Sequence, residues 1–380
     1  MTSSGRNNKV FDQRQYVPVL RWKRAERIAL RMLDPNVRAA ITPLVEIMQK
    51  DFDPDEQGKL RNVDAVLVTK AKELSKDWGP APVFVDVGLL SSDVRTNRGQ
   101  HPLRLLAENA RTHGVWIIPV TGLTRSSQFQ RDVSSIASNN GHGICIRVGR
   151  AHIEDAGFGS RLLDLVRELH IRIEEVDLIL DYQITDSLCR SLLGICERLP
   201  EIARWRTFTF ISGAFSRDLQ DFEKNLQHLH PRHDWLSWSE QAFGSQALPR
   251  VPSFGDYTIQ YPIFQEPPEF SNPSASIRYA SDAYWVIMRG EGINNDDGPG
   301  RSQWPANAQL LCERSEYAGR KFSYGDNYIY EMGSQTERTG SPETWLRAGI
   351  NHHLTYVVHQ LSMSFGSSTV SAPIPAIGRR

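Results

Sequence analysis

The chain of 380 residues has no surplus of charge of either sign. Lys and Arg together number 44, and Asp and Glu together also number 44, so the formal net charge is zero. A domain that grips nucleic acid over its whole surface is strongly basic. The balance therefore argues against such a domain, although it is compatible with a local basic patch.

Long apolar segments are also missing. No apolar run approaches the roughly 18 residues that a membrane-spanning helix needs. The first residues, 1–9, are polar and lack the apolar stretch of a secretory signal. We therefore expect no contact with a membrane.

Cysteine is scarce, and its spacing matches neither a CxxC motif nor a metal site. The four cysteines are Cys145, Cys189, Cys196 and Cys312. Cys145 stands in an apolar run, and Cys189 and Cys196 stand in a helical pattern, so we favour buried free thiols over disulfides. Free thiols are typical of a reducing compartment, and we predict a soluble, cytoplasmic protein.

Sequence motifs that would fix a reaction are absent. The chain has no P-loop, no GxSxG elbow and no kinase signature. The histidines form no HxH or HExxH pattern, which argues against a zinc site. Function must therefore be sought in the architecture.

Short apolar runs alternate with helical patterns along the first two thirds of the chain, which is typical of βαβ units with a parallel sheet. We expect strands at 16–22, 41–47, 82–87, 115–120, 143–148, 176–180, 208–211 and 257–264. Eight strands favour a (β/α)8 TIM-like barrel. The rival, an open doubly wound sheet, is less favoured because no glycine-rich dinucleotide turn follows the first strand.

Helical patterns fill the spaces between these strands, and the regularity ends near Gln265. We expect helices at 25–33, 63–74, 101–113, 126–137, 161–169, 186–199 and 219–229. Three prolines, Pro267, Pro268 and Pro273, then mark a boundary. We therefore divide the chain into a barrel (1–265), an appended region (266–363) and a flexible tail (364–380). The appended region is expected to hold a hairpin (277–279 with 284–288) and helices at 306–317 and 344–361.

Charged residues stand where several of the expected strands end. In barrels the active site lies at these ends and in the loops that follow. The candidates chosen by this rule are Arg21, Lys23, Glu46, Asp86, Arg147, Arg150 and Asp181.

Glu46 and Asp86 interrupt apolar strands, and a buried lone charge costs several kcal/mol, so each needs a partner or a wet pocket. One interpretation is internal ion pairing of Glu46 with Lys23, and of Asp86 or Asp181 with Arg147. The functional interpretations are a Mg²⁺ site made by the three carboxylates, or a phosphate or carboxylate site made by Lys23, Arg147 and Arg150.

His352 and His353 are adjacent in a helical pattern, so they diverge by about 100° and cannot face one ligand set. We favour a structural or capping role, with general acid–base chemistry by His353 as the alternative.

Several segments resemble the beta family proteins (T4-type beta protein family). The matching strings are Tyr16 to Glu26, Ile41 to Ile47, Gly255 to Tyr257, Ile277 to Tyr279, Arg289-Gly290, and Trp345 with Asn351 to Thr355. The resemblance spans nearly the whole chain. It implies a setting of phage–host conflict, such as antiviral defence, but no particular reaction. It adds Asp256 and Arg289 to the candidate ligand-binding residues, and it also covers Lys23, Glu46 and His353.

Two hypotheses follow. In the first, the barrel mouth binds an anionic ligand, a nucleotide or nucleic-acid phosphate, through Lys23 and Arg147. Glu46, Asp86 and Asp181 then bind a metal or act as a base in hydrolysis, with His353 as a proton carrier. In the second, the protein is a non-catalytic scaffold that binds a protein partner or forms a homo-oligomer. Trp285 and Trp304 of the appended region would be its anchors, because aromatic side chains are enriched at interfaces.

Overall fold

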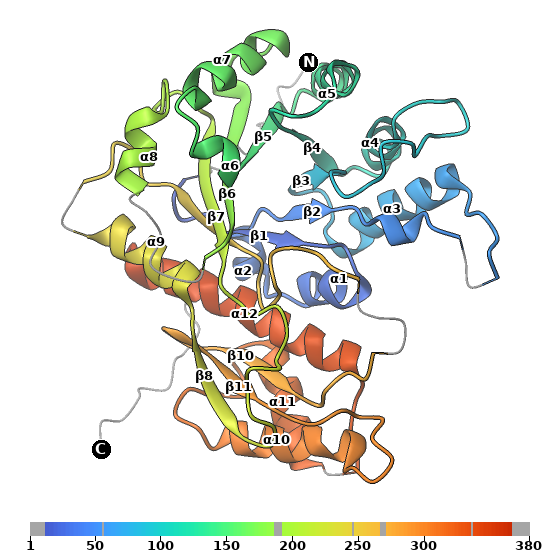
Figure 1. The fold of residues 1–380 in the computed structure, drawn as a ribbon, viewed down its shortest axis with the longest axis vertical. Helices are drawn as coiled ribbons and strands as arrows, with labels where there is room; N and C mark the ends of the chain where they lie inside the picture. The colour runs from blue at the N-terminus through green and yellow to red at the C-terminus, as the bar shows by residue number, and fades with distance from the viewer. Residues whose placement is uncertain are drawn as a thin grey trace, which may run out of the picture.

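The structure is a computed structural model, and it describes residues 12–54, 57–185, 192–244, 247–266, 271–335 and 337–366. Two bodies lie one above the other in Figure 1: a barrel, and a smaller sheet with helices. Of the tail expected at 364–380, residues 367–380 lie outside the described residues, and Ser364 is the last residue of a helix.

Eight parallel strands close into a barrel in the order β1-β2-β3-β4-β5-β6-β7-β9, which confirms the predicted (β/α)8 architecture. The strands are β1 Val17–Leu20, β2 Leu44–Glu46, β3 Pro82–Asp86, β4 Trp116–Thr121, β5 Ile144–Gly149, β6 Val176–Ile184, β7 Thr207–Gly213 and β9 Ser253–Asp256. Each consists mainly of buried residues, because helices cover the barrel outside and side chains fill it inside.

Alternate residues of the strands fill the interior of the barrel. Val17 and Val19 of β1 belong to one apolar cluster together with Phe84, Ile179 and Ile211 of the other strands. Leu20 belongs instead to the larger cluster that packs against the surrounding helices. This division follows from the two-residue period of a strand, whose side chains point alternately to opposite faces. The interior of the barrel is therefore packed with apolar side chains.

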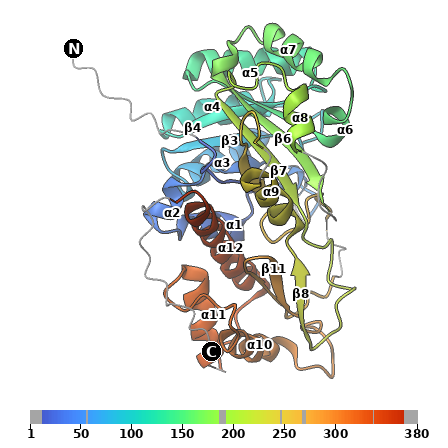
Figure 2. The same ribbon diagram turned by 90° about the vertical axis from the view of Figure 1, so that its left-hand side faces the viewer.

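Helices surround the barrel, and the last of them comes from the C-terminal end of the chain. The helices that precede β9 in the chain are α1 Arg24–Arg31, α2 Pro35–Ala39, α3 Val63–Asp77, α4 Pro102–Thr112, α5 Ser127–Asn140, α6 Arg150–Ile153, α7 Phe158–Glu168, α8 Leu192–Arg198 and α9 His233–Phe243. Helix α12 (Pro342–Ser364) packs against α1, and it runs between the barrel and the second sheet in Figures 1 and 2. It thus joins the two bodies.

The eighth barrel strand lies earlier than predicted. The expected strand at 257–264 is wrong: β9 spans Ser253–Asp256, and the chain turns directly afterwards. The Asp256 carboxylate accepts a hydrogen bond from the backbone N–H of Thr258, whose φ is +58°. This local turn ends the strand, whereas the apolar residues that follow cover the barrel end.

The predicted helix at 219–229 is also wrong. Its second half begins strand β8 (Gln227–Pro231), which pairs antiparallel with β11. Leu219, Phe222, Leu226 and Leu229 have a spacing that favours a helix, but pairing with a distant strand overrides this local preference. The segment assigned to the barrel on sequence grounds therefore supplies one strand of the second sheet.

The second sheet has three strands in the order β10-β11-β8. Strands β10 (Ile277–Ala280) and β11 (Tyr284–Met288) form the predicted hairpin. Helices α10 (Gln303–Cys312) and α12 match the two predicted helices, and α11 (Tyr324–Ser334) was not predicted. Trp285 and Trp304 are buried, so they are core residues rather than the exposed anchors expected from sequence.

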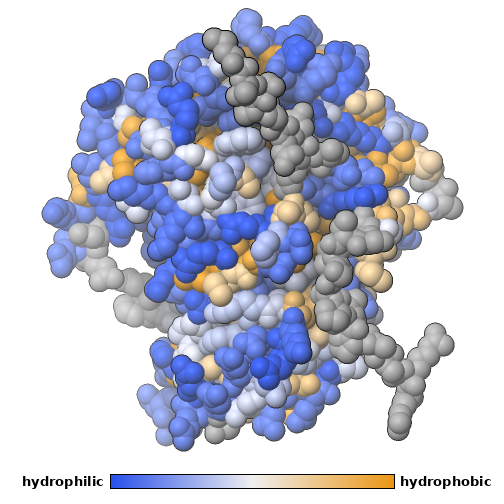
Figure 3. Space-filling view, turned by 180° about the vertical axis from the view of Figure 1, so that it is seen from behind, coloured by the Kyte–Doolittle hydropathy of each residue, from blue (hydrophilic) through white to orange (hydrophobic). Residues whose placement is uncertain are grey.

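The cysteine prediction is confirmed within the described residues. Cys145, Cys196 and Cys312 are free thiols, and the first two are buried. Cys189 lies outside the described residues. No helix in the described part of the chain is long and apolar enough to cross a membrane. The face in Figure 3 is mostly hydrophilic, with small scattered groups of hydrophobic residues.

Candidate functional site at the barrel mouth

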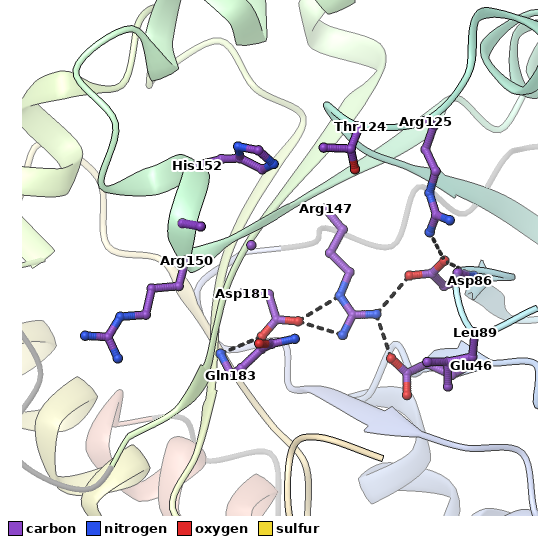
Figure 4. A pocket seen from close by; sticks show the side chains of 13 residues that line it. Glu46, Asp86, Leu89, Thr124, Arg125, Arg147, Arg150, His152, Asp181 and Gln183 are labelled. Atoms are coloured by element: carbon purple, nitrogen blue, oxygen red, sulfur yellow. Dashed lines mark hydrogen bonds and ion pairs between the residues drawn. The ribbon is translucent and has the colours of Figure 1, made fainter. Parts of the chain in front are cut away.

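A cavity of about 400 Å³ opens at the C-terminal ends of the barrel strands. Figure 4 shows how the charged side chains converge there from several strands. The lining residues are Glu46, Asp86, Gly88, Leu89, Thr124, Arg125, Arg147, Gly149, Arg150, Ala151, His152, Asp181 and Gln183. The position is the one at which barrel enzymes build their active sites.

Arg147 of β5 forms the centre of the cavity floor. Its Nη1 donates hydrogen bonds of 2.8 Å to both Glu46 Oε1 and Asp86 Oδ2. Its Nε donates to Asp181 Oδ2 at 2.8 Å, and its Nη2 lies 2.6 Å from the same oxygen and donates to the Tyr257 hydroxyl at 2.9 Å. Every N–H donor of the guanidinium is therefore engaged by the protein itself.

This arrangement tests the predicted ion pairs. The pairing of Arg147 with Asp86 or Asp181 is confirmed, and Arg147 takes both carboxylates and Glu46 as well. The predicted pair of Glu46 with Lys23 is wrong. Arg147 replaces Lys23 because β5 points its guanidinium across the barrel mouth to β2.

Electrostatics at the floor follow from its burial. Burial raises the pKa of Glu46, while the nearby Arg147 guanidinium lowers it and the Asp86 charge raises it further. Burial also raises the pKa of Tyr257, and the Asp181 charge adds to this effect. For Arg147, burial acts to lower the pKa, but the surrounding acidic groups outweigh it and the guanidinium stays charged.

A shared turn orients the aspartates at three strand ends. Asp86, Asp181 and Asp256 each accept a hydrogen bond from the backbone N–H two residues later, at 2.7–2.9 Å. Short polar side chains often stabilise turns in this way. The turn fixes the carboxylates of Asp86 and Asp181 against Arg147 and leaves that of Asp256 on the outside of the barrel.

The wall of the cavity is more open than the floor. Arg125, from the loop after β4, donates from Nη2 to Asp86 Oδ1 at 3.0 Å, and its side chain is 31% exposed. Arg150 pairs with Glu154 at the rim. Within the described part of the chain, the side chains of Thr124, His152 and Gln183 make no hydrogen bond. These groups are therefore available to a ligand.

Of the residues selected from sequence, Glu46, Asp86, Arg147, Arg150 and Asp181 come together in this cavity. Two other candidates lie nearby but do not line it. Lys23 sits 4.6 Å from the centre of the Phe264 ring, and burial lowers its pKa. Arg21 donates to the backbone carbonyls of Tyr261 and Pro262, so it holds the segment after β9 in place.

His353 and Asp256 lie elsewhere, in a buried contact between α12 and the barrel. His353 Nε2 lies 2.7 Å from Asp256 Oδ2, and the Tyr16 hydroxyl donates to Asp256 Oδ1 at 2.5 Å. All three residues are fully buried. The position favours a structural role for this pair and separates both residues from the mouth.

His352 and Arg289 also belong to the interior. His352 lies 2.9 Å from Asp326 Oδ2 and stacks on Tyr279 with ring centres 3.7 Å apart. Arg289 donates to the backbone carbonyls of Leu219 and Gly290. These contacts fix the appended region, so a ligand-binding role of Arg289 is not favoured by its position.

The carboxylates of the mouth do not form a cation cage. Glu46, Asp86 and Asp181 each turn an oxygen toward Arg147, so a guanidinium occupies the place where a shared Mg²⁺ would lie. No group of three or more His, Cys, Asp or Glu side chains in the described residues is arranged to hold a metal ion. The donor set thus fits an internal arginine rather than the Mg²⁺ considered from sequence.

The architecture and the spread of matching strings along the chain agree with one protein family. A profile described as "Beta protein" matches residues 16–359. The chain belongs to the beta protein family. The match covers the barrel, the second sheet and most of α12, so the two bodies form one family unit. A comparison with curated proteins found no significant match.

Four residues of this beta protein's mouth escaped the sequence analysis: Thr124, Arg125, His152 and Tyr257. The rule that selects strand ends does not reach them. Thr124 and Arg125 lie in the βα loop after β4, and His152 lies in α6 directly after β5. Polar and charged residues throughout each βα loop are the sequence signal for these three. Tyr257 was expected to begin the eighth barrel strand, whereas the observed strand β9 ends one residue before it, at Asp256.

Proposed function

We propose that this beta protein binds a small anionic ligand of nucleotide size at its barrel mouth. The observation that carries the proposal is the 400 Å³ cavity with Arg125 on its wall. Arg147 is not the anion-binding group, because its donors are already engaged. The anion instead contacts the wall, where cationic and neutral donors remain available.

Arg125 is suited to this role by its partial engagement. Only its Nη2 is paired, so among the described residues its Nε and Nη1 have no hydrogen-bond partner. A guanidinium edge of this kind binds phosphate or carboxylate oxygens in a bidentate manner. The Thr124 hydroxyl and the His152 ring lie on the same cavity. Arg150 lies at the rim, where it pairs with Glu154.

The size of the cavity narrows the ligand class. Pockets for small molecules commonly measure about 300–1,000 Å³, and this cavity falls at the lower end. A mononucleotide or a sugar phosphate fits such a volume, whereas a nucleic-acid strand fits only through one nucleotide. If the site is catalytic, Glu46 and His152 are the acid–base groups that face the ligand.

Calorimetric titration with AMP, ribose 5-phosphate and sulfate tests the proposal. We expect binding to the wild type and at least a tenfold loss of affinity in Arg125→Gln, because the bidentate contact is removed. Arg172→Gln is the matched control: Arg172 pairs with Glu175 on the surface with a side chain 75% exposed, and its loss should leave binding unchanged.

Two results would overturn the proposal. One is the absence of binding of every anion of the panel to the wild type. The other is equal affinity of the wild type and Arg125→Gln, with both proteins folded by circular dichroism. Either would leave the mouth as a site of internal ion pairing.

A second candidate function is a non-catalytic interaction protein, and strand β8 favours it. β8 is an edge strand of the second sheet, and Leu229 in it and the adjacent Leu226 are 49% and 48% exposed. Exposed edges with apolar side chains can pair with another chain. Size-exclusion chromatography with light scattering tests this: a monomeric state of the wild type would count against self-association through β8.

The biological setting stays a prediction. A role in phage–host conflict and a location in the cytoplasm are part of our proposal, supported by family membership and by the free thiols. Expression of the wild type and of Arg125→Gln in a phage-challenged host tests the setting: protection that requires Arg125 would link it to the mouth.

A further inference from the structure

The floor of the mouth carries more negative than positive charge. Three carboxylates, those of Glu46, Asp86 and Asp181, meet two guanidinium groups, those of Arg147 and Arg125. Three negative charges against two positive charges leave one negative charge in excess when all groups are ionised. A buried excess charge is costly unless a proton or a polar partner compensates it.

The oxygens of these carboxylates differ in what they contact. Asp86 Oδ1 accepts from Gly88 N–H and Arg125, and its Oδ2 accepts from Arg147. Asp181 Oδ1 accepts from Gln183 N–H, and its Oδ2 accepts from Arg147 and Tyr257. Both aspartates therefore accept at least one hydrogen bond on each oxygen.

Glu46 is the exception. Its Oε1 accepts from Arg147 Nη1, but its Oε2 takes no hydrogen bond from the described residues. The residue is only 6% exposed and lines the cavity. Oε2 is not among the buried atoms that lack a partner, so it is open to the cavity, where a hydrogen-bond donor of a ligand can reach it.

We propose that Glu46 recognises a hydrogen-bond donor of the ligand, a hydroxyl or amino group at the end opposite its anion. This inference rests on the proposed function, in which Arg125 holds the anion. It makes the ligand an anion with hydroxyl or amino groups, such as a sugar phosphate or a nucleotide, and not a simple anion. Separate elements contact the two ends of the ligand: Glu46 at the end of β2 contacts the donor group, and Arg125 in the loop after β4 contacts the anion.

The geometry also explains why Arg125 recognises the anion while Glu46 recognises the hydroxyl or amino group. Arg147 fixes Oε1 of Glu46 and thereby directs Oε2, so the carboxylate needs no rearrangement when the ligand arrives. Such preorganised polar groups discriminate strongly against ligands that lack the matching donor, because a ligand that covers Oε2 without donating to it leaves this acceptor unpaired.

The test compares anions with and without donors on matched variants. Glu46→Gln keeps the size of the side chain, and its carbonyl oxygen can still accept from Arg147. Its NH2 group then faces the ligand, donor against donor. We expect the wild type to bind ribose 5-phosphate and AMP more tightly than sulfate. We expect Glu46→Gln to lose at least tenfold in affinity for the first two, with its sulfate affinity within twofold.

Controls separate this inference from the proposed function. Glu108→Gln, which removes an exposed carboxylate of α4, should bind all three anions as the wild type does. Arg125→Gln should weaken sulfate as well as the larger anions. If Arg125→Gln weakens binding but Glu46→Gln leaves all affinities unchanged, or lowers them equally, the inference is overturned and the proposed function stands.

If Glu46→Gln does not fold, the affinities of the wild type for different anions still test the role of Glu46. In the wild type alone, sulfate and ribose 5-phosphate should differ in affinity by at least tenfold. Equal affinity would overturn the inference. Failure of every anion to bind the wild type would overturn the proposed function, and this inference with it.

Discussion

At the scale of single residues, Arg147 decides the character of the barrel mouth. Its side chain is 14% exposed and joins carboxylates from β2, β3 and β6. Such a buried cluster is weak evidence for stability, because desolvation offsets much of the attraction. Removing one partner lowers the stability strongly, since the remaining charges are then buried without compensation.

We predict that Arg147→Met lowers the free energy of unfolding by about 3–5 kcal/mol, the usual cost of breaking a buried ion pair. Urea denaturation followed by tryptophan fluorescence measures it. Arg172→Met is the control, because exposed pairs contribute only about 0–1 kcal/mol. A loss in Arg147→Met no larger than in this control would contradict the view that the arginine neutralises the floor.

At the scale of elements, close contact between α11 and α12 holds the appended region together. A Cβ atom at Gly325 of α11 would overlap the backbone carbonyl oxygen of Ala348 in α12. The Gly325 N–H donates to Asn351 Oδ1 at 2.9 Å, and Asn351 Nδ2 donates in turn to the Ala29 carbonyl of α1. The crossing therefore requires glycine for lack of space rather than for backbone conformation.

A pair of glycine substitutions tests the crossing. Gly325→Ala should lower the free energy of unfolding by about 1–3 kcal/mol, as overpacking of a close contact does. Gly194→Ala, in α8, has no atom within 4 Å of the added Cβ, and it should be neutral or stabilise by up to about 1 kcal/mol through helix propensity. Thermal and urea unfolding of both variants would refute the argument if Gly325→Ala matched Gly194→Ala.

At the scale of the whole molecule, a buried polar cluster ties α12 to the barrel. It contains Tyr16, Asp256 and His353, and the neighbouring Arg232 and Asp234. Burial and, to a lesser extent, the Asp256 charge raise the pKa of Asp234 to about 7. Burial lowers the pKa of His353, although Asp256 opposes this effect.

The raised pKa of Asp234 makes stability depend on pH. A carboxyl group with a folded pKa above its unfolded value of 3.8 contributes stability that is present below the unfolded value. That contribution is lost as pH rises through about 7. Relative to Asp234→Asn, the wild type should lose on the order of 1 kcal/mol per pH unit between pH 5 and 7, and little more above pH 8.

Urea unfolding of the two proteins at pH 5, 6, 7 and 8 measures this difference. The variant retains His353 and Asp256, both of which have lowered pKa values and contribute stability that is lost as pH falls, the opposite direction from Asp234. A difference between the two proteins that is constant over this range would show that Asp234 is not protonated in the folded state.

The barrel was predictable because its signals are local. Apolar runs of strand length alternate with helical patterns, and charged residues interrupt the strands at their ends. These features placed seven of the eight barrel strands, and they selected Glu46, Asp86, Arg147, Arg150 and Asp181. The predicted position of the eighth strand was wrong, because one side chain sets the turn at Asp256, whereas the apolar residues beyond it have the same pattern as a strand.

Other features depended on contacts between segments far apart in the sequence. Strand β8 has a helical pattern of apolar residues but pairs with β11, more than 50 residues later. His353 fits an acid–base role by residue type, yet α12 places it against Asp256 in the interior. Neither result follows from local patterns, because pairing partners and burial are properties of the folded chain.

The sequence by itself determined the (β/α)8 class, the family and the carboxylates at the strand ends. Each of these rests on periodicity or on short strings that local structure preserves. Only the tertiary structure decided that Arg147 pairs with all three carboxylates, that Arg125 and His152 form the open wall, and that one oxygen of Glu46 has no hydrogen-bond partner among the described residues. The physical reason is that closing the barrel brings side chains from distant strands to one point, where charge and hydrogen bonding must be balanced together.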